Sequence, residues 1–188
     1  MPFQPDQVAG WRRGLPDLDG SFATLREAHV DMGKALWRAL CPTEIVHLFA
    51  PAPRTQDAFT LWLTELRASR EAGSGFAFMA EANIPIGVIA VRALEPSFQT
   101  AEWAFAFAPD RWATHAVGEA LTLVRDFVFE TVGAHRIECR TFADSDLRIA
   151  CLRRLGAAEE GRLRRSTRID EDYVDQLLWS IVRADRLN

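Results

Sequence analysis

The chain has 188 residues, 48% of them hydrophobic, and a formal net charge of −4 at pH 7. This length suits a single domain with a substantial core, and the negative charge argues against a general nucleic-acid binder, which needs a basic face to replace counterions. The three cysteines, Cys41, Cys139 and Cys151, are odd in number and unclustered, which favours a reduced compartment over a disulfide framework.

The first part of the chain predicts an arm, a strand and two helices. Residues 1–19 combine prolines, glycines and charges, which is typical of an irregular arm, so we expect the folded domain to span residues 20–188. Residues 21–26 alternate at the period of a strand. Apolar residues at helical spacing then predict one helix that ends before Pro42 and another that begins at Thr55.

The second part predicts strands around one helix. Residues 76–80 and 86–92 read as a hairpin, and the aromatics of residues 101–108 alternate with small residues, as in a strand. A helix then runs from Ala116 to Gly133, followed by a strand at 136–142. The remaining elements are a short helix and a terminal hairpin. The helix begins near Ser145, ends at Gly156 and is predicted to bury an apolar face of Leu147, Ala150, Cys151 and Leu155.

The unit formed by strand 101–108, the helix from Ala116 and strand 136–142 organises the rest of the chain. Two strands joined through a helix pair in parallel through a right-handed crossover. Such a unit directs the N-terminus of its helix, with unpaired N–H groups, at the end of a strand. We therefore expect an anionic ligand at that position.

Four phrases, in this order and spacing, carry a family resemblance: AEWAFAFAPDRW, GEALTLVRDFVFETVGAHRIECR, LRRLGAAEEGRLR and YVDQLLWSIVRADR. Between Gly20 and Arg186 the chain resembles the GNAT superfamily of acyl-CoA-dependent N-acyltransferases, in particular its Rim-type (RimJ/RimL-like) branch. The resemblance implies a single α/β (α+β) domain with a mixed, splayed β-sheet and helices on both faces. It further implies transfer of an acetyl or other acyl group from the matching acyl-CoA, acetyl-CoA in the first case, to a primary amine by direct attack in a ternary complex, with a protein N-terminus as one candidate acceptor.

The family binds the coenzyme A pyrophosphate at a loop with the pattern Gln/Arg-x-x-Gly-x-Gly/Ala. Here the corresponding residues 112–117 read WATHAV and depart from the pattern at each defining position. This departure favours the alternative of a degenerate GNAT-fold binding or regulatory protein without acyl transfer. The residues that the resemblance implies as coenzyme contacts are Phe105, Ala106 and Phe107 on the strand, and Ala116, Val117 and Gly118, whose N–H groups remain donors at the helix start. Two departures from the pattern offer compensation by their own chemistry, since His115 can donate a hydrogen bond and Arg148 suits a phosphate.

Acyl transfer to an amine needs a base and, for the departing thiolate, an acid. In relatives the base is often a carboxylate on the strand that corresponds to residues 101–108, which makes Glu102 the candidate, half buried between Ala101 and Trp103. An ordinary surface glutamate is the alternative. For the acid, Ser145 and Cys151 are the candidates, and core packing explains Cys151 better.

Other features restrict partners and location. No apolar run approaches the roughly 20 residues of a membrane helix, and the first twenty residues lack the order of a signal peptide, so we expect a cytoplasmic protein. The four histidines are scattered without ligand spacing, so we expect no metal. We expect a small-molecule or peptide amine as the acceptor; a homodimer formed through the terminal hairpin is a further alternative.

Overall fold

The computed structural model describes residues 10–169 and 171–184. Its sheet has eight strands in the order β1-β2-β3-β4-β5-β6-β8-β7. All neighbours are antiparallel except β5 and β6, which are parallel, so the predicted mixed sheet is confirmed. The strands are β1 (Leu18–Asp19), β2 (Thr24–Glu27), β3 (Gly75–Ala82), β4 (Ile84–Ala93), β5 (Thr100–Phe107), β6 (Arg136–Phe142), β7 (Ala158–Ile169) and β8 (Asp172–Val182).

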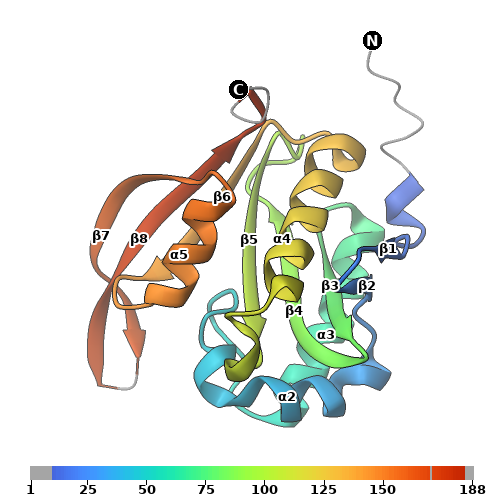
Figure 1. The fold of residues 1–188 in the computed structure, drawn as a ribbon, viewed down its shortest axis with the longest axis horizontal. Coiled ribbons are helices and arrows are strands. Elements are labelled where there is room, and N and C mark those ends of the chain that lie inside the picture. Colours follow the sequence, from blue (N-terminus) through green and yellow to red (C-terminus); the bar gives the residue numbers. More distant parts are fainter. Residues whose placement is uncertain (1–9, 170, 185–188) are drawn as a thin grey trace.

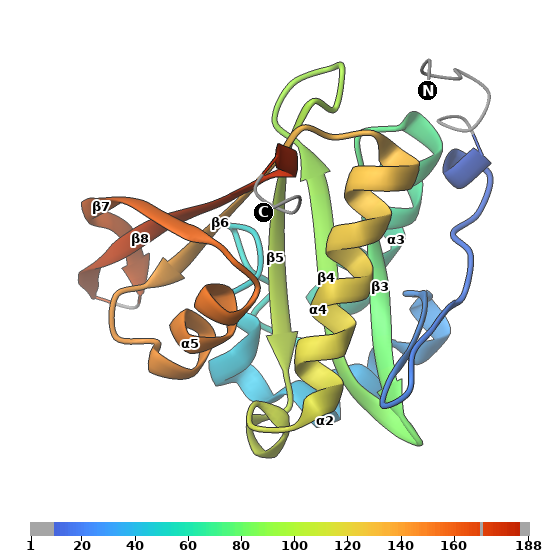
Figure 2. The same ribbon diagram turned by 45° about the horizontal axis from the view of Figure 1, so that its top comes forward.

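Helices cover both faces of this sheet (Figures 1 and 2). On one face lie α2 (Gly33–Ile45) and α3 (Gln56–Ala72), and on the other lie α4 (His115–Phe127) and α5 (Asp146–Arg154). The alternation along β5 separates the two cores, because its aromatics pack with α4 and α5 whereas Ala106 packs with α2 and α3. This arrangement confirms the predicted fold class.

The sheet splits between β5 and β6. The two strands pair only where Thr100–Glu102 lies beside residues 136–138. Beyond that point they separate, and α5 lies in front of the gap (Figure 1). The predicted splayed sheet is therefore present, and its opening begins at Trp103.

The predicted end of the first helix before Pro42 is confirmed, since α2 consists of two helical segments joined by a kink at Cys41. The chain takes a left-handed turn at Cys41, with φ 50°, and helical geometry resumes from Pro42 to Ile45. Proline is compatible with the first turn of a helix, because its missing N–H would have no partner there. The extra turn matters because it carries Glu44 to the split in the sheet.

Residues 10–19 of the predicted arm contact the core, while residues 1–9 lie outside the described residues. A 3-10 turn at Gly10–Arg12 buries Trp11, which is 2% exposed, with its ring centroid 5.1 Å from that of Phe76. Strand β1 then pairs with β2. The glycines and prolines indicated irregular backbone correctly, but they gave no sign that one tryptophan anchors the segment to the core.

Candidate active site

The free edge of β5 is the first component of the site. Because the Ala108 N–H donates to the Ile86 carbonyl of β4, alternate residues of β5 direct their main chain at β4. The main-chain N–H and C=O groups of Trp103, Phe105 and Phe107 point the other way, toward the split between β5 and β6. The predicted contacts Phe105, Ala106 and Phe107 are all buried. The structure thus places the main chain of two of them on the edge that β6 leaves uncovered.

Arg148 of α5 fills part of this split. Its Nη1 donates to the Phe105 carbonyl at 2.5 Å, and its Nη2 lies 2.5 Å from Glu44 Oε2. The indole of Trp112 donates to the same carboxylate oxygen at 3.1 Å, and its ring lies 4.5 Å from the guanidinium carbon. Burial lowers the pKa of Arg148 to about 10, while the charge of Glu44 opposes this shift. The guanidinium is therefore held by two elements on opposite faces of the sheet.

This position corrects two expectations. We expected Arg148 to contact a phosphate at the start of the helix, but it does not line the cavity found there. We also expected Leu147 on the apolar face of its helix, whereas Leu147 is 56% exposed and Arg148 points inward. The physical reason is Glu44, because a buried guanidinium is stable when a carboxylate and a carbonyl accept its hydrogen bonds.

The start of α4 is the second component. His115, Ala116 and Val117 are its first residues, so their N–H groups have no acceptor within the helix. The hydroxyl of Thr114 donates to the Arg111 carbonyl and does not cap the helix. A cavity of about 380 Å³ opens beside these groups, lined by His115 and Gly118 among others.

Gly118 has no packing reason to be glycine. A Cβ built on it would meet no atom within 4 Å, although glycine inside a helix is less stable than alanine by about 0.5–1 kcal/mol. The missing side chain leaves bare backbone beside the cavity. This is the kind of surface that lets a phosphate approach a helix N-terminus closely.

Glu119 fixes the wall of this cavity. Its carboxylate accepts the N–H groups of Ser21, Phe22 and Ala23 at 2.8, 2.6 and 2.8 Å. Desolvation acts to raise the pKa of Glu119, but these three bonds outweigh it and lower the pKa below its ordinary value. The turn thus held stacks the Phe22 ring on His115, with 5.2 Å between centroids. His115 is exposed beside the cavity, with one ring face against Phe22.

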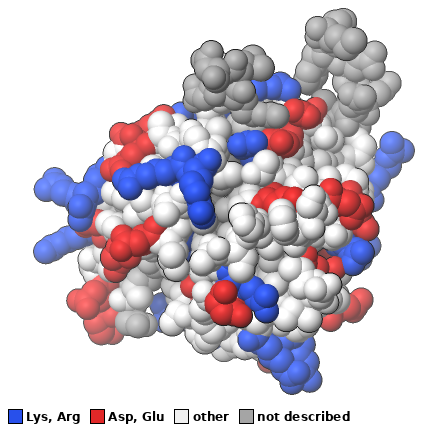
Figure 3. Space-filling view, in the orientation of Figure 1, with Lys and Arg blue, Asp and Glu red and all other residues white. Residues whose placement is uncertain are grey.

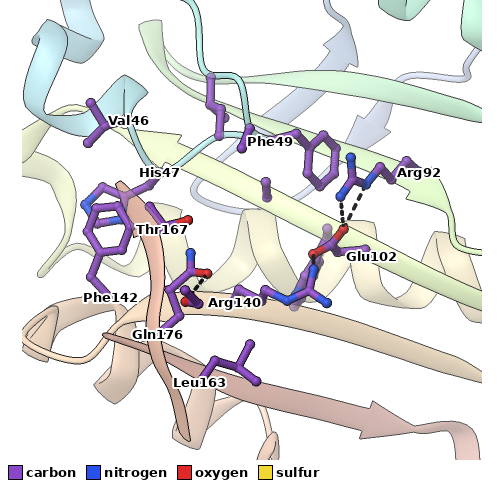
Figure 4. Close-up of a pocket in the computed structure, with 15 residues that line it drawn as sticks. Val46, His47, Phe49, Arg92, Glu102, Arg140, Phe142, Leu163, Thr167 and Gln176 are labelled. Atoms are coloured by element: carbon purple, nitrogen blue, oxygen red, sulfur yellow. Dashed lines mark hydrogen bonds and ion pairs between the residues drawn. The ribbon is translucent and has the colours of Figure 1, made fainter. Parts of the chain in front are cut away.

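A second cavity, of about 290 Å³, opens at the other end of β5, on the side of α2 and α3 (Figure 4). Glu102 lies in its wall, buried rather than half buried, and between two guanidinium groups rather than apolar neighbours. Arg92 donates to one carboxylate oxygen through Nε at 2.8 Å and Nη2 at 2.5 Å, and Arg140 donates to the other through Nη1 at 2.5 Å. The expected apolar surroundings are wrong, because the strand pairing places Arg92 directly opposite Glu102. The role of Glu102 as general base stays a prediction.

His47 is a component that the sequence analysis missed. It follows α2, lines the same cavity and packs its ring against Phe142 at 4.4 Å. Burial and, to a smaller degree, the charge of Arg148 lower the pKa of His47 to about 3. The imidazole is therefore neutral at physiological pH. A single histidine after a proline-containing segment carries no sequence signal of this role.

Ser145 lies apart from Glu102. It occupies the position before α5, where it was expected, but its side chain makes no capping bond. It lines a neighbouring cavity that adjoins the one around Glu102 along Val46, His47 and Phe142. The structure does not bring Ser145 and Glu102 into one cavity, and the assignment of Ser145 as acid stays a prediction.

The remaining surface offers fewer specific features. Basic side chains project from the edge formed by β7 and β8 (Figure 3), where Arg162 pairs with Asp175 and Arg168 with Glu171. Among the described residues, no group of three or more His, Cys, Asp or Glu residues is placed to hold a metal ion. None of the described helices is both long and apolar enough to cross a membrane.

Comparison with protein families gives a match between one family model and this chain. Residues 23–158 match the model of an acetyltransferase (GNAT) domain. Comparison with curated proteins gives no significant match.

Several solved structures share the fold. RimJ of Mycobacterium smegmatis, solved in complex with CoA-disulfide, is 21% identical, with a TM-score of 0.75 over 87% of this chain and 83% of that chain. The ribosomal-protein-S5-alanine acetyltransferase of Vibrio fischeri is 16% identical, with a TM-score of 0.75 over 90% and 98%. RimL, a ribosomal L7/L12 alpha-N-protein acetyltransferase in complex with coenzyme A, is 16% identical, with a TM-score of 0.79 over 89% and 98%. At these identities the likeness concerns the fold.

Proposed function

Since the chain belongs to the GNAT acetyltransferase family, with Rim-type enzymes among its structural neighbours, we propose that it transfers an acetyl group from acetyl-CoA to a primary amine by direct attack in a ternary complex. The observation that supports this best is the course of β5. One end leads to the donors at the start of α4, the other end lines the cavity around Glu102, and its free edge connects the two.

The residues at the start of α4 suit the pyrophosphate of acetyl-CoA. The N–H groups of His115, Ala116 and Val117 lie at the positive end of the helix dipole, Gly118 leaves room beside them, and the exposed Arg154 lines the same cavity. We propose that these residues hold the diphosphate. The departures from the family loop then change side chains around a donor set that remains in place.

Along β5, main-chain groups would serve the reacting end of the ligand. Bound acetyl-CoA supplies a thioester, whose C–S bond breaks as the amide C–N bond forms. The N–H groups of Phe105 and Phe107 are the proposed donors to the thioester oxygen. Glu102 is the proposed acceptor of the proton that the amine loses, and Ser145 the proposed donor to the leaving thiolate.

A second candidate function rests on Arg148. Its guanidinium donates a hydrogen bond to the Phe105 carbonyl on the free edge of β5. This bond uses an acceptor that a ligand lying along β5 would otherwise use. Together with the departures at residues 112–117, this contact favours a GNAT-fold binding or regulatory protein that performs no acyl transfer.

Calorimetry with acetyl-CoA and with free CoA separates the two candidates. We expect micromolar binding, about −8 kcal/mol, together with thiol release when an amine is added. Gly118→Leu should weaken CoA binding at least tenfold without unfolding the protein, because the new side chain enters the cavity. Gly161→Leu is the matched control, since a Cβ on Gly161 also meets nothing within 4 Å and this residue lies on β7.

Each outcome has a clear meaning. No heat with either ligand at millimolar concentration would favour the non-enzymatic function. Tight binding that Gly118→Leu leaves unchanged would show that the ligand does not pass the start of α4. Equal weakening by Gly161→Leu would indicate a general effect of the substitution.

A further inference from the structure

The cavity around Glu102 carries information about the acceptor. It is enclosed by the segment after α2, by β5, by Phe142 of β6 and by the hairpin of β7 and β8 (Figure 4). Its volume of about 290 Å³ lies at the small end of the range for ligand cavities, about 300–1,000 Å³. A compact molecule fits such a space better than a folded chain end with several ordered residues.

Two arginines line this cavity, and each has N–H groups that do not donate to Glu102. Arg92 uses Nε and Nη2 for Glu102, and Arg140 uses Nη1, so these bonds leave Nη1 of Arg92 and Nε and Nη2 of Arg140 to face a ligand. Their side chains are 42% and 37% exposed, whereas Glu102 is 5% exposed. The ring of Phe49 also packs 4.3 Å from the Arg92 guanidinium carbon. Glu102 thus orients both guanidinium groups, and Phe49 adds a second contact for Arg92.

The charges in this wall do not cancel. Two guanidinium groups oppose one buried carboxylate, and His47 is neutral because burial lowers its pKa to about 3. Nearby, the Ser166 hydroxyl lies 2.9 Å from Gln176 Oε1, which leaves the amide group of Gln176 as a further donor. The polar part of the cavity therefore offers an excess of positive charge and of N–H groups, which suits a carboxylate.

From this geometry we propose that the acceptor is a compact primary amine that bears a carboxylate, as in a free amino acid, and that Arg92 and Arg140 bind this carboxylate. In addition to its proposed role as the base, Glu102 holds both arginines in place through these hydrogen bonds. The proposal rests on the proposed acetyl transfer for the role of the ligand as acceptor. The carboxylate site itself does not depend on that reaction.

The binding test uses N-acetyl-amino acids and their amides, added to the full chain without coenzyme. We expect calorimetry to detect binding of at least one N-acetyl-amino acid with a free carboxylate, and its amide to bind about 10- to 100-fold more weakly, the range for a hydrogen bond to a charged group. Arg140→Gln should remove this discrimination. Arg136→Gln is the matched control, because Arg136 lies on the same strand and pairs with Glu138 but does not line the cavity.

The kinetic test uses amino acids, amino acid amides and amidated tripeptides as acceptors, with thiol release as the readout. We expect the lowest KM for amino acids, and a rise in KM rather than a fall in kcat in Arg140→Gln. Three results with the wild-type protein would overturn the proposal: amides that bind as tightly as the acids, amidated peptides that react as fast as amino acids, or no binding of any N-acetyl-amino acid. These results do not depend on whether the Arg140→Gln variant folds. A wild-type protein that binds an N-acetyl-amino acid but binds no CoA would instead overturn the proposed function and leave the proposed carboxylate site intact.

Discussion

At the scale of single residues, the site is held by buried ion pairs between segments that are distant in the chain. Arg148 and Glu44 are 104 positions apart in the chain, and nothing in either local pattern indicates that each turns inward to meet the other. Glu102 was recognisable as a candidate from its strand and family position, but its two arginine partners follow only from strand register. Pairwise burial of charge is a tertiary property, because each group is stable inside only when the other is present.

His47 gives the first prediction at this scale. Its pKa of about 3 in the folded protein lies below its ordinary value of 6.5. Below pH 6.5 the unfolded chain therefore takes up a proton at His47 that the folded protein does not. As the pH is lowered from 6.5 to about 3, the free energy of unfolding falls by up to about 1.4 kcal/mol per pH unit. His47→Gln removes this dependence. By pH 5 the wild type should have lost about 2 kcal/mol relative to the variant.

Urea denaturation of both proteins at pH 7, 6 and 5 measures this difference. Other groups titrate equally in both proteins, so the change in the gap between them isolates His47. Parallel profiles over this range would contradict the low pKa.

At the scale of elements, periodicity predicted more. The alternation of aromatics along β5 gave the strand and its two faces, and the helical spacing after Ala116 gave α4. The same method misplaced the buried face of α5, since a helix of nine residues offers few positions and one of the buried ones is an arginine. It ended the first helix correctly before Pro42, but it gave no sign of the short helical segment that follows, because proline is compatible with the first turn of a new helix.

The pairing of β4 with β5 gives a prediction at this scale. Gly87 lies opposite Phe107, and a Cβ on Gly87 would come within 2.2 Å of that ring and 2.8 Å of the Ala106 carbonyl oxygen. Gly87→Ala should therefore lower the free energy of unfolding by about 1–3 kcal/mol, the usual effect of overpacking. Gly161→Ala on β7, where a Cβ meets nothing within 4 Å, should change it by less than about 0.5 kcal/mol. Equal midpoints of denaturation in the two variants would refute this view of the contact.

At the scale of the whole molecule, the order of elements and the family were within reach of the sequence. The element order from β2 onward and the split sheet agree with the structure and with the family match over residues 23–158. The contents of the site were not within reach, because its walls come from segments as distant as His47 and Gln176. Local patterns specify elements, whereas a cavity is specified by how several elements meet.

The split in the sheet also predicts which strands unfold locally first. Strands β3, β4 and β5 are buried over most of their length, whereas β7 is largely exposed and joins the rest through β8 and β6. Hydrogen exchange under native conditions should therefore proceed in two groups, with β7 and β8 exchanging first and β3 to β5 last. Mass spectrometry of peptides from the exchanged protein resolves the two groups. Uniform exchange across the sheet would show that the short contact between β5 and β6 couples both parts.

That short contact has a consequence for the growing polypeptide on the ribosome. Synthesis completes β5 well before β6, so the edge of β5 that contains Trp103, Phe105 and Phe107 waits without a partner while α4 is made. An uncovered, aromatic strand edge is a template for pairing with other chains. Even after β6 emerges, it covers β5 only at Thr100–Glu102. Among the described residues, no strand pairs with the rest of this edge, and α5 is the later element that contacts it, through Arg148 and the Phe105 carbonyl.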